Sequence, residues 1–302
     1  MDSNCHRDKE MDVLTLDEWK SIIDQLKFYN PKRIILIGGE PLLFKEIGKL
    51  ITYCRYILTE SELVLYSNIT LLDENLIEIL AQNSVKVVTS IYSNKEEVHD
   101  KVTGHSGSFK KTVFNIKRLR ERNIFVKANI VVLKYNFNSI SEIMDFTYNL
   151  TGVKSKIDIV RDVGESKQYL IPKELEIPMN RIKTKPVFNG IDMNKFIRNY
   201  SGNSCWQGKI NIECDGSITP CIMENKFKNK IYNTRLQSLD KILEKYLIPQ
   251  FWNVSRDYIE VCKDCEYRYV CKDCRPICEN GRSMYLRGDI CKYDPYEGKW
   301  NK

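Results

Sequence analysis

The sequence lacks the features that mark several large classes of protein. It has no stretch of about 18 consecutive apolar residues, so we expect no membrane-spanning helix, and its first residues hold no apolar segment typical of a signal peptide. It also lacks a GxGxxG turn, a Walker loop and the histidine pair of a zinc finger. These absences predict a cytoplasmic protein and give no support to the common nucleotide-binding folds.

Histidine is scarce and the net charge is modest. We expect each of the three histidines to be a polar surface or loop residue rather than a metal ligand: His6, His99 and His105. The net charge of +7 over 302 residues comes from scattered lysines, which are typical of an ordinary exposed surface with a weak preference for an acidic partner. We therefore expect neither a nucleic acid nor a membrane as a partner.

Cysteine, by contrast, is abundant and unevenly placed. Nine of the 11 cysteines follow residue 204, and five of these lie between Cys262 and Cys278. Two cysteines separated by two residues can bind one metal centre, because a tight turn points both sulfur atoms the same way. The pattern favours a metal site over packing or disulfides, and the spacing alone leaves both zinc and an iron–sulfur cluster open.

Helix and strand patterns alternate over the first 165 or so residues. Capping boxes at Thr15 with Glu18 and at Ser139 with Glu142 predict two helix starts. We expect further helices at 44–57, 73–82 and 109–122, and strands at 33–37, 62–66, 85–89, 125–133 and 156–160. The apolar run 33–37 is suited to a strand buried on both sides. Repeated strand–helix units predict a parallel sheet covered by helices, either open or barrel-like.

The pattern changes after residue 160. Three prolines interrupt the segment 161–200, which we interpret as a connection: Pro172, Pro178 and Pro186. Beyond it, a hairpin around Asp215-Gly216 and a helix at 237–246 are expected. The tail from 255 to 302 has too few apolar residues for its own core, so we expect loops held by metal ligands. The predicted domains are 1–185 and 186–302.

One short motif stands where a parallel strand is expected to end. Gly-Gly-Glu-Pro at residues 38–41 directly follows the apolar run 33–37. At the carboxyl end of a parallel strand, glycines let a ligand approach the backbone, and a carboxylate can accept hydrogen bonds from an ammonium group. Taken alone, a glycine pair after a strand more often marks only a turn.

The capped helix, the buried strand and this motif together resemble the radical S-adenosylmethionine enzymes. The resemblance implies an α/β fold, a partial (β/α)6 barrel lacking its first strand, because the chain opens with a helix. It also implies that the motif binds the amino group of S-adenosylmethionine and that three further residues lie at the rim of the cofactor. The implied cofactor site comprises Gly38, Gly39, Glu40, Pro41, Ser67, Asn68 and Ser90. The segments His99–Gly104 and Gly107–Phe109 resemble a loop and a helix start common in these proteins.

The second half resembles the SPASM extension of the same superfamily, a small cysteine-rich iron–sulfur domain. The resemblance implies two auxiliary four-iron four-sulfur clusters. One would be held by Cys262, Cys265, Cys271 and Cys291, and the other by Cys205, Cys214, Cys221 and Cys274. The family spacing after Cys271 is three residues, whereas this chain has Cys274 after two and Cys278 after six, so we prefer Cys274 and leave Cys278 as a spare thiol.

The Cys-x3-Cys-x2-Cys motif that defines the superfamily, and that binds its catalytic cluster, is absent from the sequence. It would sit after the first barrel strand, just upstream of residue 1, and the lone Cys5 cannot replace it. The missing motif and the missing strand indicate the same gap. A truncation, or a start at an internal Met1, is the simpler explanation, and a natural variant that has lost catalysis is the other.

Within the superfamily, the segments around Cys205, Cys221 and Cys265–Cys274 look most like maturases of ribosomally made peptides. Such an enzyme takes an electron from a donor such as flavodoxin or ferredoxin and installs a thioether or related cross-link in a precursor peptide. A third, catalytic cluster is implied only for a full-length form, and the chain as written is expected not to cleave S-adenosylmethionine. The alternative is a non-catalytic module that binds zinc or iron–sulfur and recognises a peptide.

Overall fold

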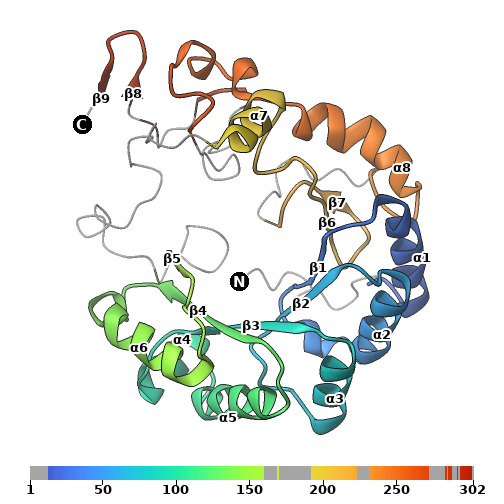
Figure 1. Cartoon of the computed structure of the whole chain (residues 1–302), viewed down its shortest axis with the longest axis vertical. Coiled ribbons are helices and arrows are strands. Elements are labelled where there is room, and N and C mark those ends of the chain that lie inside the picture. The colour runs from blue at the N-terminus through green and yellow to red at the C-terminus, as the bar shows by residue number, and fades with distance from the viewer. Residues whose placement is uncertain are drawn as a thin grey trace. The chain divides into compact units, whose positions relative to one another are not determined.

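The computed structural model describes residues 13–159, 169, 192–222, 231–271, 283, 285–287, 291 and 293–300. The chain forms two compact units, residues 1–179 and residues 180–302. Each unit has its own set of strands and helices (Figure 1). No helix of the described part has the length and apolar character that crossing a membrane requires.

A curved parallel β-sheet forms the centre of the first unit (Figure 1). Its strands are β1 (Arg33–Leu36), β2 (Glu62–Tyr66), β3 (Lys86–Ile91), β4 (Val126–Val132) and β5 (Ile157–Ile159), and they pair in that order. Sequential order with parallel pairing is what repeated strand–helix units produce. The result is a curled half-barrel, so the predicted α/β class with a helix-covered parallel sheet is confirmed.

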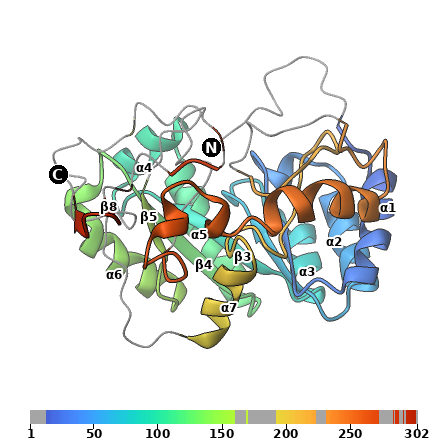
Figure 2. The same ribbon diagram turned by 90° about the horizontal axis from the view of Figure 1, so that it is seen from above.

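Six α-helices accompany the described part of this sheet. They are α1 (Leu16–Leu26), α2 (Ile47–Ile57), α3 (Glu74–Gln82), α4 (Glu96–Thr103), α5 (Ser108–Glu121) and α6 (Ile140–Thr151). Helices α1, α2 and α3 lie side by side along the outer side of the sheet (Figures 1 and 2). The core fills the layer between helices and sheet. Fully buried members include Leu63, Leu65, Val87 and Ala128 on the strands and Ile51, Leu80 and Ile116 on the helices.

The two predicted capping boxes have different outcomes. At α1, Thr15 Oγ1 accepts from Glu18 N at 3.3 Å, and Glu18 Oε2 accepts from Thr15 N at 2.7 Å, so this box is confirmed. The box at Ser139 is wrong, because its side chain makes no capping hydrogen bond. A 3₁₀ turn, η4 (Phe137–Ser139), runs directly into α6 and leaves Ser139 at φ −116° and ψ 18°, far from the extended backbone of an N-cap.

Strand β1 is less buried than its sequence suggests. Ile35 is 45% exposed and Ile37 is 40% exposed, so the prediction of a strand buried on both faces is wrong. The reason is that β1 is an edge strand of the described sheet, and helices cover only one of its faces. The helix expected from residue 44 begins at Ile47, after a 3₁₀ turn, η3 (Pro41–Leu43).

The second unit is built from short elements. They are α7 (Met193–Ser201), the hairpin β6 (Asn211–Ile212) and β7 (Ile218–Thr219), α8 (Leu239–Ile242), the π-helix η7 (Leu243–Trp252), the 3₁₀ turns η8 (Arg256–Tyr258) and η9 (Cys262–Asp264), and the hairpin β8 (Tyr293–Asp294) and β9 (Lys299–Trp300). Aromatic rings form the centre of this unit. Trp206 and Tyr246 each pack edge-on against Phe251, at centroid distances of 5.3 and 5.1 Å, and all three are buried.

The predicted hairpin around Asp215-Gly216 is confirmed, and the helix expected at 237–246 continues as η7 to Trp252. Two elements of this second unit were missed. Helix α7 lies in the segment interpreted as a connection, where Asp192 Oδ1 caps it by accepting from Asn194 N at 3.0 Å. The hairpin β8–β9 lies in the tail that we expected to be only loops. The three prolines of the connection lie outside the described residues.

Candidate functional site

Glu40 joins the carboxyl ends of two neighbouring parallel strands. It follows the Gly38-Gly39 bend after β1. Its Oε1 accepts from Ser67 Oγ at 2.6 Å and from Leu42 N at 3.1 Å. Its Oε2 accepts from Asn68 N, just after β2, at 2.9 Å. The carboxylate therefore fixes the loop after β1 against the loop after β2, and three of the seven predicted cofactor residues come together there.

The loop after β2 holds a strained residue. Ile69 has φ +57°, a left-handed backbone that is a genuine outlier for a β-branched side chain. Its N–H donates to Ser67 Oγ at 2.8 Å, and its carbonyl accepts from Asn115 Nδ2 of α5 at 2.7 Å. Arg118 Nη1 in turn donates to Asn115 Oδ1 at 2.7 Å. A strained backbone of this kind persists only where contacts with its surroundings hold it in place. Helix α5 supplies such contacts to Ile69, beside the predicted site.

Ser90 lies on the face of the sheet that the helices do not cover. Val87 and Ile91 of β3 pack into the helix-covered core, so Ser90 points to the opposite, concave face. It pairs in register with Asn129 of β4, whose Oδ1 is buried and has no hydrogen-bond partner among the described residues. Asn129 was missed in the sequence, although polar residues alternate with apolar ones along β4. Ser90 and Asn129 therefore form a neighbouring polar pair on the concave face.

The loop between α4 and α5 is closed by Asp100. Its Oδ2 accepts from Gly107 N at 2.6 Å, and its Oδ1 accepts from Ser108 Oγ and Phe109 N at 2.8 Å each. Asp100 thereby satisfies N–H groups at the start of α5 that have no partner within that helix. The segment His99–Gly104, which we expected to be a loop, is instead the end of helix α4 with its C-cap, and through Asp100 it braces the helix that supports Ile69.

His99 is 1% exposed, so the prediction that it lies on the surface or in a loop is wrong. Its Nδ1 accepts from Tyr92 N at 3.3 Å, and its ring packs between Tyr92 and Phe109. Tyr92 directly follows β3. His99 is therefore a buried hydrogen-bond acceptor that fixes the end of this strand. Burial is the main cause that lowers the pKa of His99 to about 4.

This depressed pKa predicts acid destabilisation of the first unit. The folded pKa of about 4 lies below the unfolded value of about 6.5, so the unfolded state binds more protons between these values. The free energy of unfolding should fall by about 2 kcal/mol between pH 7.5 and pH 5. Urea unfolding followed by circular dichroism measures it. His99→Gln cannot gain this charge and should lose most of the dependence; an unchanged dependence in the variant would assign the effect to other groups.

The cysteines of the run 262–271 are held by tight turns. Cys265 N donates to Cys262 O at 3.1 Å, and Cys271 N donates to Tyr267 O at 2.8 Å. Burial, and to a lesser extent the charges of Glu266 and Cys291, raise the pKa of the Cys265 thiol. Cys265 and Cys291, which the resemblance assigns to one cluster, thus lie near enough to each other for an electrostatic interaction.

The other predicted ligands are more dispersed. Cys205 is exposed and Cys221 is half-buried. Cys214 is disulfide-bonded. A thiolate is the form that binds metal, so Cys214 would have to be reduced before it could act as a ligand. Cys5, Cys274 and Cys278 lie outside the described residues.

The thiol donors fit an iron–sulfur centre by their chemistry. Among the residues that the structure describes, no three cysteine, histidine or acidic side chains converge as they would around a bound ion. Cys54 differs from the predicted ligand cysteines. It is 1% exposed in the core of the first unit, and burial raises its pKa to about 12, so it is a packing residue.

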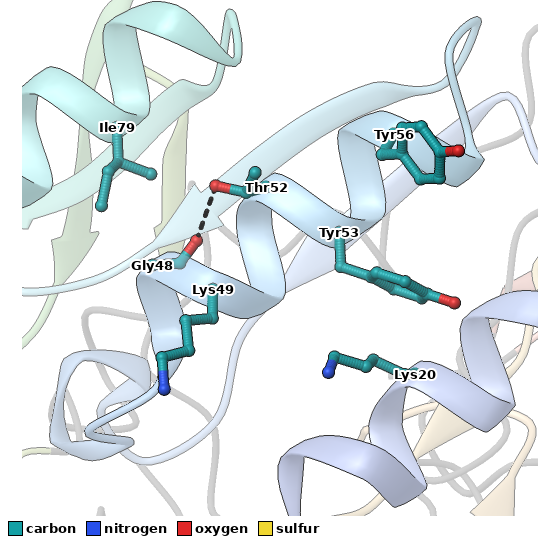
Figure 3. Close-up of a pocket in the computed structure, with 7 residues that line it drawn as sticks. All are labelled: Lys20, Gly48, Lys49, Thr52, Tyr53, Tyr56 and Ile79. Carbon is teal, nitrogen blue, oxygen red and sulfur yellow. Dashed lines mark hydrogen bonds between the residues drawn. The ribbon is translucent and has the colours of Figure 1, made fainter.

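A surface hollow of about 430 Å³ lies on the helix side of the first unit (Figure 3). Its lining residues come from α1, α2 and α3: Lys20, Gly48, Lys49, Thr52, Tyr53, Tyr56 and Ile79. Lys20 is paired with Asp17 of α1, and Lys49 is paired with Glu46 at the N-cap of α2. A side chain at Gly48 would lie 2.8 Å from Ile79 Cδ1, so glycine permits the close approach of α2 and α3. None of the predicted site residues lines this hollow.

Comparisons with known proteins agree with this arrangement. Residues 3–147 match the radical SAM superfamily, and residues 205–266 match the SPASM iron–sulfur cluster-binding domain. The chain is 25% identical over 318 residues to the AdoMet-dependent heme synthase of Methanosarcina barkeri, and this match covers 94% of this chain and 87% of that protein. It is also 25% identical over 225 residues to the sporulation killing factor maturation protein SkfB of Bacillus subtilis, covering 70% of this chain and about half (54%) of SkfB.

The fold is similar to that of Streptococcus suis SuiB, solved with its precursor peptide SuiA. The TM-score is 0.69 at 19% identity, and the match covers 94% of this chain and 70% of SuiB. Each unit contains one of the two family matches, and the structure joins the Gly-Gly-Glu-Pro motif to the neighbouring strand end. The chain belongs to the radical S-adenosylmethionine superfamily, carries a SPASM domain and resembles the enzymes that mature ribosomally made peptides.

Proposed function

We propose that this chain belongs to an enzyme that modifies a ribosomally made precursor peptide by radical S-adenosylmethionine chemistry and forms a thioether or related cross-link, and that these 302 residues by themselves bind the cofactor and the peptide without completing the reaction. The observation that carries the proposal is the Glu40 joint at the carboxyl ends of β1 and β2, in a chain that also matches the SPASM domain. The similarity to SkfB supports a peptide as the substrate. Flavodoxin or ferredoxin is the proposed class of electron donor, and the cytoplasm is the compartment that keeps such thiols reduced.

The proposed roles follow from where the residues lie. Gly38–Pro41 would hold S-adenosylmethionine at the end of β1, with Ser67 and Asn68 shaping its rim through Glu40. Ser90 and the unpartnered Asn129 Oδ1 offer polar contacts on the concave face. When bound, the cofactor and iron–sulfur clusters supply the one-electron chemistry, while the protein positions the substrate and excludes water.

The proposed cluster ligands divide into two sets. Cys262, Cys265, Cys271 and Cys291 would hold one auxiliary cluster, and Cys205, Cys214, Cys221 and Cys274 would hold the other. The 302 residues contain no Cys-x3-Cys-x2-Cys, so a catalytic third cluster has no thiolate set among them. The chain should therefore bind S-adenosylmethionine without cleaving it.

The test is anaerobic incubation of the reconstituted chain with dithionite and S-adenosylmethionine. Calorimetry should detect cofactor binding, and chromatography should detect no 5′-deoxyadenosine. Measurable 5′-deoxyadenosine would contradict the assignment of the cysteines, and absence of cofactor binding would contradict the proposed site. Titration with peptides encoded beside this gene should identify one that binds.

Tetrapyrrole modification is a second candidate, because the similarity to the heme synthase covers most of both proteins. An iron porphyrin added to the chain would then shift its Soret band on binding. Porphyrin binding without binding of any neighbouring peptide would favour this candidate over the peptide maturase.

A further inference from the structure

Two tyrosine hydroxyls bond the hairpin β8–β9 to the cysteine loop 262–271. Tyr293 Oη donates to the Glu266 carboxylate. Tyr296 Oη donates to Asp264 Oδ2 at 2.7 Å. Asp264 and Glu266 flank Cys265 on its two sides. Both neighbours of one predicted ligand are therefore held by the same hairpin.

The hairpin begins beside another predicted ligand of the same cluster. Tyr293 is two residues after Cys291. Its ring is 5% exposed and lies 5.0 Å from the ring of Tyr267 and 5.1 Å from that of Trp300, measured between centroids. Arg287 Nη1 donates to the carbonyl of Tyr293 at 2.6 Å. The start of the hairpin is thus fixed by packing, while the hydroxyl adds one directed bond to the cysteine loop.

The hairpin β8–β9 is too small to be stable by itself. Each of its strands has two residues, and an isolated two-stranded hairpin is at best marginally stable in water. Residues 262 and 291 are 29 positions apart, and closing a loop of this length costs entropy unless other bonds hold its ends. The two tyrosine–carboxylate bonds connect the segments that carry Cys265 and Cys291.

We propose that the pairs Tyr293–Glu266 and Tyr296–Asp264 form a strap that positions Cys265 and Cys291 on one iron–sulfur centre and slows the loss of iron from it. The inference rests on the proposed iron–sulfur function and names two tyrosines and two carboxylates as positioning residues. Hydrogen bonds that orient ligands typically change metal affinity by 10- to 100-fold when they are removed.

The experiment uses the full chain reconstituted anaerobically with iron and sulfide. Tyr293→Phe and Tyr296→Phe keep the rings and remove only the hydroxyls. In the double variant, iron should pass to a ferrous chelator about tenfold faster than in the wild type. Tyr258→Phe is the matched control, because this ring is 65% exposed in the same unit, and its rate should equal that of the wild type.

A second pair of variants tests the acceptor side of the strap. Glu266→Gln keeps an oxygen that can accept from Tyr293, so it should retain iron like the wild type. It also removes one negative charge beside the cluster, so the midpoint potential followed by electron paramagnetic resonance should rise. Glu266→Leu has no acceptor and should release iron at the rate of Tyr293→Phe.

The outcomes separate this inference from the proposed function. A wild-type chain that holds iron and sulfide, together with a double variant that releases iron at the wild-type rate, would overturn the strap alone. Equal iron release by Glu266→Gln and Glu266→Leu would also overturn it. A wild-type chain that takes up no iron would overturn the proposed function and the strap together.

Discussion

Replacing Glu40 with leucine is expected to weaken S-adenosylmethionine binding about 100-fold. The substitution removes the acceptor of three hydrogen bonds, from Ser67 Oγ, Leu42 N and Asn68 N. Each donor left without a partner costs roughly 1–3 kcal/mol where water cannot replace the bond, and a 100-fold change corresponds to about 2.8 kcal/mol, which is close to the lower limit for three donors. The loops after β1 and β2 would separate, and the cofactor would lose its preorganised rim. Isothermal titration calorimetry measures the effect.

Two companion variants sharpen this prediction. Glu40→Gln keeps one acceptor oxygen, so its affinity should fall between those of the wild type and the leucine variant. Glu97→Leu is the control, because Glu97 is exposed in the first turn of α4, and it should bind like the wild type. Wild-type affinity in Glu40→Leu would show that the joint between β1 and β2 does not form the cofactor site.

Replacing Cys265 with serine is expected to remove one auxiliary cluster. The iron content should fall from about eight to about four per chain, with an equal loss of sulfide, because a cluster of this type is held by cysteine thiolates. Cys265 is chosen because it lies in the tight turn with Cys262 and its pKa responds to Cys291. Iron and sulfide analysis after anaerobic reconstitution gives the result.

Cys54→Ala is the matched control for this experiment. Cys54 is buried in the core of the first unit and should not touch a cluster, so the iron content should stay at the wild-type value. An unchanged iron content in Cys265→Ser, or a loss in Cys54→Ala, would contradict the proposed ligand set.

The regular part of the fold could be predicted from the sequence because its signals are local. The alternation of apolar strands with amphipathic helices identified all five described strands of the sheet, and the cap at Thr15 depends on residues three positions apart. Helix α7 was missed because the prolines before it dominated the interpretation of the whole segment 161–200. Ser139 was mistaken for a cap because the 3₁₀ turn before α6 leaves no signal in the capping pattern.

The candidate site could be predicted only in part. Resemblance placed Glu40, Ser67 and Asn68 near one cofactor, but the bonds between them join residues 27 and 28 positions apart and depend on the pairing of β1 with β2. The burial of His99 has the same origin, since it depends on the end of β3 and on Phe109 of α5. The tyrosine strap joins residues 27 and 32 positions apart, which no local pattern reveals.

Iron, acid-labile sulfide and zinc per chain, measured on anaerobically purified protein, test the central claim most directly. We predict about eight irons with matching sulfide and no stoichiometric zinc, as expected for two four-iron clusters in the SPASM domain. About two zincs without sulfide would make the cysteines structural zinc ligands, and the chain would then be a non-catalytic binding module rather than an iron–sulfur enzyme.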